Sequence, residues 1–144
     1  MSKLPELAWI AEAKKHIGQK EIKGSKHNPL FLSWLQKLKA WWFEDESAWC
    51  GLYVAICLYE AHIDYPKHWY RALDYLNYGT KLYKPAYGCV AVKKRKGGGH
   101  VCFVVGKTKE GKLVCLGGNQ NDMVCYALYN ESDFEAFFLF FFPL

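Results

Sequence analysis

Residues 44–57 read EDESAWCGLYVAIC, a polar turn that runs into a helix with a cysteine in its first turn. Asp45 and Ser47 are residue types that cap helix N-termini, and acidic side chains suit the positive end of the helix dipole. After Cys50, apolar residues recur at helical spacing, which predicts one buried face on a helix that ends near Ala61. Backbone N–H groups and the dipole favour a thiolate there, and the thiolate is the nucleophilic form of cysteine. Cysteine is also one of the most buried residue types, so a core role for Cys50 stays open.

The length and composition predict one folded domain, residues 1–144. Apolar residues make up 51%, aromatic residues 17% and charged residues 23%, which argues against disorder. The net charge of +5 suits an anionic partner such as nucleic acid, a membrane surface or an acidic wall polymer. Pro5 and Glu6 interrupt the N-terminal pattern that a signal peptide needs. The apolar run 136–144 is shorter than the roughly 20 residues of a membrane helix, and we expect it to be a buried last strand.

The chain divides into a helical first part and a strand-rich second part. Besides the Cys50 helix, periodic apolar residues predict helices at 5–17, 28–42 and 69–76, the last one stopped by Gly79. Short segments rich in Val, Phe, Tyr and Cys predict strands at 87–92, 101–105, 112–116, 123–128 and 134–142. Helices followed by antiparallel strands indicate an α+β fold.

The positions of the cysteine and histidine residues limit the kinds of site that the chain can form. The six cysteines include no CxxC pair, so the spacing of a zinc site is missing and we expect no metal or cofactor. Cys102 and Cys115 lie in strand-like runs and are predicted to be buried, reduced thiols. His100 follows the run KKRKGGG at 93–99 and opens a strand, where three glycines let the backbone pass close to a partner. A flexible basic hairpin that ends in a chance histidine is the alternative interpretation.

A thiol hydrolase needs a thiolate, an imidazole that shares and returns the proton, and a polar group that fixes the imidazole tautomer. Cys50 at a helix start and His100 on a later strand occur in the papain-like order. Asn119 follows the next predicted strand and fits the third role, although Gly-Gly-Asn is also ordinary turn chemistry. Asp122, three residues on, is the competing candidate for orienting the ring.

Four motifs together make this pattern specific: DExxWCG at 45–51, ALDYLNYG at 72–79, GGHVxFVVG at 98–106 and LGGNQ at 116–120. Their order resembles a compact family within the CHAP and NlpC/P60-type cysteine peptidases, which are bacterial and phage peptidoglycan hydrolases that include small single-domain endolysins. The resemblance runs from about Gly18 to Phe142, and an entry loop similar to the family's begins at Gly18. One departure is Gly117, where many CHAP domains carry a glutamate two residues before the asparagine.

The resemblance implies a papain-like α+β fold, with the Cys50 helix packed across an antiparallel sheet. It implies that Cys50 is the nucleophile, that His100 is the base and then the acid, and that Asn119 orients His100. Four further residues are candidates for shaping the substrate cleft, and each could equally be a cap or a packing residue: Glu21, Asp45, Trp49 and Gln120.

The function implied is cleavage of an amide bond in peptidoglycan, as an N-acetylmuramoyl-L-alanine amidase or a stem-peptide endopeptidase of the phage endolysin kind. We expect a monomer made in the bacterial host cytoplasm without a signal peptide and acting on the cell wall. We expect no separate wall-binding domain, no nucleic-acid partner and no membrane insertion. The alternative is a non-catalytic basic module that binds wall polymer or nucleic acid through Lys93–Lys96, because a basic cluster binds phosphates without any nucleophile.

Overall fold

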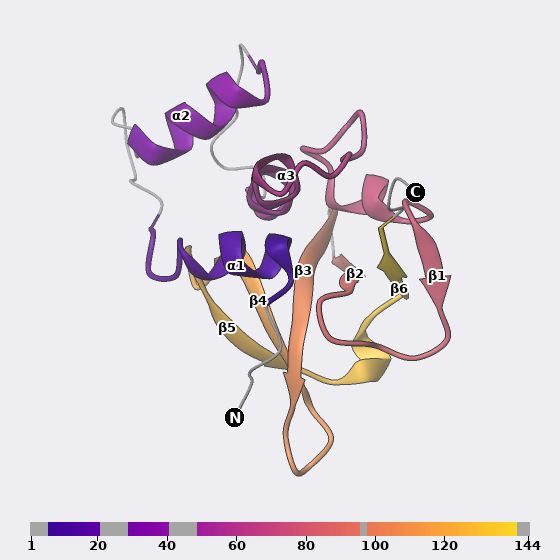
Figure 1. Cartoon of the computed structure of the whole chain (residues 1–144). Coiled ribbons are helices and arrows are strands. Elements are labelled where there is room, and N and C mark those ends of the chain that lie inside the picture. The colour runs from indigo at the N-terminus through magenta and orange to yellow at the C-terminus, as the bar shows by residue number, and fades with distance from the viewer. Residues whose placement is uncertain (1–5, 21–28, 41–48, 96–97, 141–144) are drawn as a thin grey trace.

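The computed structural model describes residues 6–20, 29–40, 49–95 and 98–140, and within them the α-helices precede the strands (Figure 1). The fold is α+β, as predicted. The helices are α1 (Ala8–Lys14), α2 (Pro29–Lys37), α3 (Cys50–Glu60) and the short 3-10 turns η1 (Ala72–Tyr75) and η2 (Glu131–Asp133). The strands are β1 (Thr80–Leu82), β2 (Val90–Arg95), β3 (Gly98–Lys107), β4 (Leu113–Gln120), β5 (Met123–Tyr129) and β6 (Ala136–Leu139).

The strands form one antiparallel sheet in the order β1-β6-β2-β3-β4-β5. The last strand inserts between β1 and β2, and Phe137 and Phe138 in it are buried. The buried last strand predicted from the apolar C-terminal run is therefore confirmed for β6, while residues 141–144 lie outside the described part. Figure 1 shows α3 end-on over the sheet, with α1 and α2 beside it.

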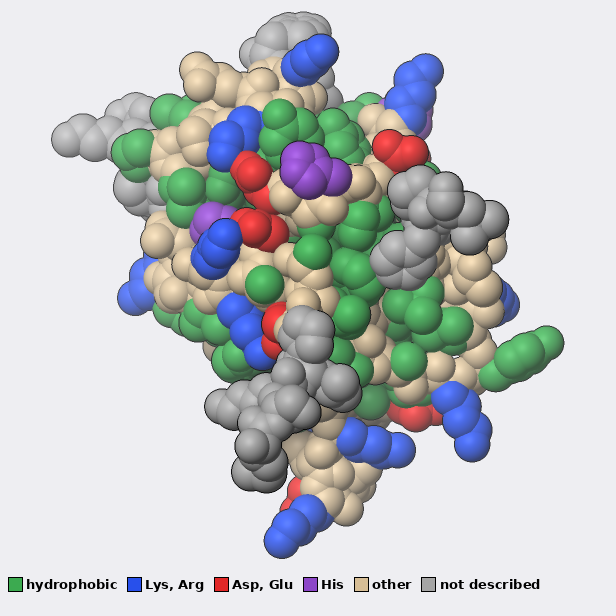
Figure 2. Space-filling model, in the orientation of Figure 1, with side chains coloured by type: hydrophobic (Ala, Val, Ile, Leu, Met, Phe, Trp, Pro, Cys, Tyr) green, Lys and Arg blue, Asp and Glu red, His purple; other side chains and the backbone are tan. Residues whose placement is uncertain are grey.

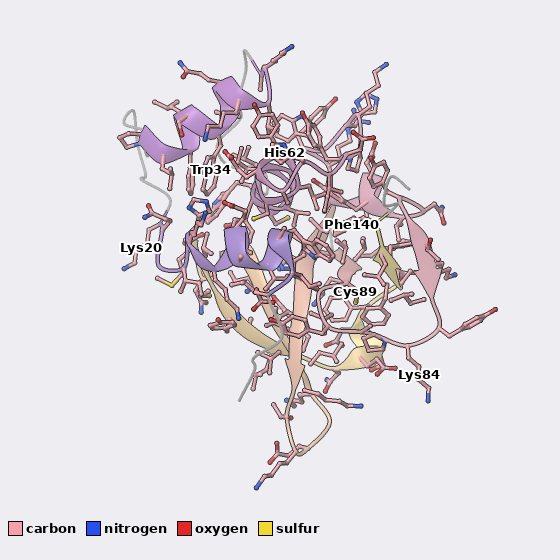
Figure 3. The ribbon with its side chains drawn as sticks, in the orientation of Figure 1. Lys20, Trp34, His62, Lys84, Cys89 and Phe140 are labelled. Carbon is pink, nitrogen blue, oxygen red and sulfur yellow. The ribbon has the colours of Figure 1, made fainter. Side chains whose placement is uncertain are left out.

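Helix α3 is enclosed on all sides rather than on one face. Each of its residues from Cys50 to Leu58 is buried. The ring of Trp34, on α2, lies 6.2 Å from the ring of Tyr53 and points into the space between the helices (Figure 3). The Tyr53 hydroxyl donates to the Ala13 carbonyl of α1 at 2.7 Å. Because α1, α2 and the sheet all pack against it, α3 needs an apolar surface all round, which a single amphipathic stripe would not supply.

The two faces of the sheet pack against different partners. Side chains alternate along a strand, so Val101 and Phe103 of β3 face the helices together with Leu116 of β4. The intervening Cys102 and its neighbour Cys115 pack in a second cluster on the opposite face. This second cluster includes Phe137 and lies against Phe134, from the connection between β5 and β6. The predicted burial of the two strand thiols is confirmed.

Several predicted boundaries were wrong. The helix expected at 69–76 is only the η1 turn, because Arg71 and Leu76 on either side of it have extended backbone angles. Gly79 does not stop a helix: its φ is +108° and a Cβ there would meet the Leu139 carbonyl, so glycine lets the chain approach β6. Strand β1 was not predicted, since it has only three residues, two of them exposed. Helices α1 and α2 are shorter than expected, and residues 41–42 are not described.

Candidate functional site

Three elements bring the predicted catalytic residues to one end of the sheet. Cys50 begins α3, His100 lies near the start of β3, and Asn119 and Gln120 end the antiparallel neighbour β4. The side chains of Cys50 and His100 are both 0% exposed. The site is therefore closed to solvent in this structure.

The thiol meets β3 where the pairing with β4 stops. Within the described residues, the β3–β4 ladder begins at Phe103, paired with Leu116, and no earlier residue of β3 is paired with β4. Val104 donates its N–H to the carbonyl of Cys89, the residue before β2, so alternation along the strand aims the Val101 N–H towards the β4 side. This N–H acts on the Cys50 thiol and favours its ionised form. Cys50 thus lies beside the backbone that carries His100.

Burial outweighs the groups that would ionise Cys50. Desolvation raises the pKa of the thiol, while the Val101 N–H, the charge of Arg95 and the first N–H groups of the helix lower it by less. The sequence-based expectation of a thiolate at the helix start is therefore wrong for this closed form. The helix terminus contributes as expected, but the neighbouring side chains exclude the water that an anion needs.

The imidazole of His100 is held by Gln120, one residue after the predicted Asn119. His100 Nε2 lies 3.0 Å from Gln120 Oε1. The Gln120 amide nitrogen donates to the backbone carbonyls of Cys125 at 2.6 Å and Cys115 at 3.4 Å. Both of those partners are acceptors, so the amide oxygen must face His100. The imidazole proton consequently lies on Nε2, which leaves the lone pair on Nδ1.

Backbone geometry at the end of β4 explains why Gln120 takes this position. Asn119 has a left-handed φ of +58°, and the β4–β5 register shifts between Gly117 and Gln120. This irregularity breaks the alternation that would have put Asn119 on the His100 side. A Cβ on Gly117 would lie 2.7 Å from Gln120 Oε1 and 2.9 Å from the Cys102 Cβ. The missing side chain at 117, where the sequence departs from the CHAP pattern, thus leaves the space that Gln120 fills.

Tyr129 completes the polar group around His100, and sequence reasoning did not find it. Its hydroxyl donates to Gln120 Oε1 at 3.1 Å, and its ring centroid is 5.9 Å from that of His100. The Lys93 ammonium lies 4.7 Å from the Tyr129 ring centroid, a cation–π distance. In the sequence, a tyrosine at the end of an apolar strand cannot be distinguished from a residue that only packs in the core.

His100 is neutral at physiological pH. Burial and the positive charges of Arg95 and Lys93 lower its pKa to about 4, and the hydrogen bond that Nε2–H donates to Gln120 opposes them. Nδ1 is buried and has no hydrogen-bond partner among the described residues. A neutral imidazole with a free lone pair on Nδ1 has the protonation state of a general base.

The thiol and the imidazole do not form a hydrogen-bonded pair here. Alternation along β3 puts His100 on the sheet face of Cys102, whereas Cys50 comes from α3 on the face of Val101 and Phe103. Proton transfer between Cys50 and Nδ1 therefore requires a rearrangement of this end of the sheet.

The other predicted site residues have different surroundings. Trp49 is buried, with its ring 4.6 Å from that of Phe31, so it packs in the core and does not line an open cleft. Asp122 is exposed in the turn between β4 and β5 with a φ of +60°. Glu21 and Asp45 lie outside the described residues.

Metal-ligand side chains and surface charges were compared over the part of the chain that the structure describes. Among the described residues, no three His, Cys, Asp or Glu side chains lie close enough together to hold a metal ion. On the face shown in Figure 2, the Lys and Arg side chains are scattered, and the described ion pairs include Lys37 with Glu60 at 2.6 Å. None of the described helices is both long and apolar enough to span a bilayer.

The chain matches no protein-family model, no curated protein and no solved structure. The resemblance to CHAP and NlpC/P60 peptidases therefore stays a prediction from the sequence motifs.

Proposed function

We propose that the protein is a papain-like cysteine hydrolase that cleaves an amide bond of peptidoglycan, as an amidase or a stem-peptide endopeptidase of the endolysin kind. One observation carries the proposal: Gln120 fixes the proton of His100 on Nε2, so that Nδ1 keeps its lone pair. The next residue of the same strand, Val101, directs its N–H at the Cys50 thiol. A base, an orienting amide and a thiol at a helix start are the parts of a thiol-dependent acyl transfer.

Cys50 and His100 supply the nucleophile and the proton transfers of each step. His100 Nδ1 takes the proton of Cys50, and the sulfur attacks the carbonyl carbon of the scissile amide. The Cys50 backbone N–H, at the start of α3, supports the oxyanion of the tetrahedral intermediate. The imidazolium then gives its proton to the leaving amine, which leaves a thioester on Cys50. A water molecule, deprotonated by His100, hydrolyses the thioester and frees the thiol.

The buried positions of the thiol and the imidazole set a condition on this mechanism. The substrate reaches Cys50 only after the residues that cover it move, and His100 must come within hydrogen-bonding distance of the thiol from the other face of β3. Opening also hydrates the thiol and removes the main cause of its raised pKa. The proposal therefore includes an opening step before chemistry, whose rate limits the reaction of Cys50 with any reagent.

Digestion of purified peptidoglycan, with mass spectrometry of the released fragments, tests the proposal and identifies the bond. We expect Cys50→Ala and His100→Ala to release no fragments. Cys57→Ala is the matched control, since Cys57 is equally buried in the same helix and lies away from the site. Fragment release by Cys50→Ala at the parental rate, in protein with parental circular dichroism, would refute the nucleophile assignment.

A second comparison separates Gln120 from Asn119. We expect Gln120→Ala to lower turnover strongly, because the ring loses the acceptor that sets its tautomer. Asn119→Gly keeps the left-handed backbone and should retain most of the activity. Gln120→Glu should raise the pKa of His100 through the added negative charge and move the acid limb of the pH–rate profile upwards. If Asn119→Gly is crippled and Gln120→Ala is near normal, the orienting residue is Asn119.

A non-catalytic basic module is the second candidate function, and the burial of Cys50 and His100 favours it. Lys94 and Arg95 are exposed at the end of β2, and Lys93 is half-buried beside them. Such a module would bind an anionic wall polymer with an affinity that falls steeply with salt, and alkylation by iodoacetamide would leave binding unchanged. A hydrolase instead loses its fragment release on alkylation.

A further inference from the structure

Strand β5 is an open edge of the sheet, on the side away from β1 (Figure 1). The two edges differ in their protection. Strand β1 has three residues and includes Lys81, whereas β5 has seven residues, Met123 to Tyr129, and none of them is charged. Natural proteins protect edge strands with short length, charge, proline or covering segments, because unpaired backbone groups recruit another strand. By this comparison β1 is protected and β5 is not.

Only the first part of β5 has a second neighbour. Val124 exchanges backbone hydrogen bonds with Gln19 and Gly18, each at 2.8 Å, and Lys20, labelled in Figure 3, bridges to Met123. The outward-pointing backbone groups of Val124 establish by alternation that those of Tyr126 and Leu128 also point away from β4. No described residue pairs with either of them on that side.

The side chains at the free part of the edge are apolar and exposed. Tyr126 is 48% exposed and Leu128 is 56% exposed, and both lie on the helix side of the sheet. Ala127 between them is small and half-buried on the other side. The edge thus combines unpaired donors and acceptors with an uncharged surface, which is a combination that pairs with another strand.

We propose that β5 pairs with β5 of a second copy of this chain, which continues the sheet across a two-fold axis at Ala127. In this antiparallel register, Tyr126 of one copy faces Leu128 of the other, and the reverse holds at the symmetric position. Their outward N–H and C=O groups then form reciprocal hydrogen bonds, and the tyrosine ring covers the leucine of its partner. The segment is self-complementary, which a two-fold interface requires.

This dimer goes beyond the proposed hydrolase function and differs from the monomer expected from the sequence. Its interface involves neither Cys50 nor His100. The free part of the edge is short, so the interface is small. We therefore expect a weak association that is populated only at high protein concentration.

Light scattering on a size-exclusion column over a range of loading concentrations tests the dimer. We expect the mass of the native chain to rise towards twice the chain mass as concentration increases. Tyr126→Lys/Leu128→Lys puts like charges opposite each other and should remain at the mass of one chain. The matched control is Leu32→Lys/Tyr83→Lys, the same change at two exposed residues away from β5, and it should associate like the native chain. An equimolar mixture of the β5 lysine pair with Tyr126→Glu/Leu128→Glu should recover the doubled mass.

A cysteine at the axis tests the register. In the proposed register Ala127 faces Ala127 of the second copy in a non-hydrogen-bonded pair. The two Cα atoms of such a pair are about 4.5 Å apart, which is within disulfide range. Ala127→Cys should give an intermolecular disulfide on mild oxidation, whereas the native chain and Leu32→Cys should not. A native chain with the mass of one copy at every concentration would overturn the proposal. So would a dimer that the β5 lysine pair leaves intact.

Discussion

His100 should make the protein lose stability in mild acid. The pKa of His100 is about 4 in the folded chain, below its ordinary value of 6.5, chiefly because of burial. As pH falls from 6.5, the unfolded chain binds a proton at this residue before the folded chain does. The free energy of unfolding therefore decreases between pH 6.5 and about 4 and is unaffected by His100 above this window. At about 1.4 kcal/mol per pKa unit, the loss amounts to about 3 kcal/mol.

Urea unfolding of the native chain and of His100→Gln at a series of pH values measures this loss. Glutamine is neutral and can still donate to Gln120, so the variant should be less stable at neutral pH but free of the His100 contribution. The difference between the two free energies should shrink by about 3 kcal/mol from pH 7 to pH 4. Subtraction removes the carboxylates, which titrate in both proteins. A constant difference between the native chain and His100→Gln would refute the assigned burial of the imidazole.

Three more measurements follow from the packing and the site. Gly118→Ala should lower the free energy of unfolding in urea by about 1–3 kcal/mol, since the new Cβ would lie 2.7 Å from the Tyr53 Cβ and 2.8 Å from the Trp49 ring. Gly98→Ala is the control and should cost far less, because its Cβ would meet nothing within 4 Å. Equal losses in the two variants would contradict this account. Tyr53→Phe should lower stability by about 1 kcal/mol, because the buried hydroxyl that donates to Ala13 is lost, and an unchanged midpoint would argue against that bond. Peptidoglycan cleavage should survive EDTA and dialysis, and a loss of activity restored by zinc would reverse the expectation of a metal-free reaction.

Local sequence patterns determined the architecture and the region of the site. Helical spacing after Cys50 predicted α3, and the Val- and Phe-rich segments after residue 80 predicted the sheet, because these signals reflect short-range periodicity. The order of Cys50, His100 and the amide residues at 119 and 120 also indicated that they would lie close together, since antiparallel neighbours place the start of β3 beside the end of β4.

The tertiary structure alone decided which atoms meet. Gln120 and not Asn119 holds His100, because the left-handed backbone at Asn119 shifts the side-chain alternation and Gly117 leaves room for the glutamine. Burial raises the pKa of Cys50 although its place at the helix start predicted the reverse. Both outcomes depend on contacts between residues far apart in the chain. Such contacts set desolvation and hydrogen-bond partners, and no local pattern of residues encodes them.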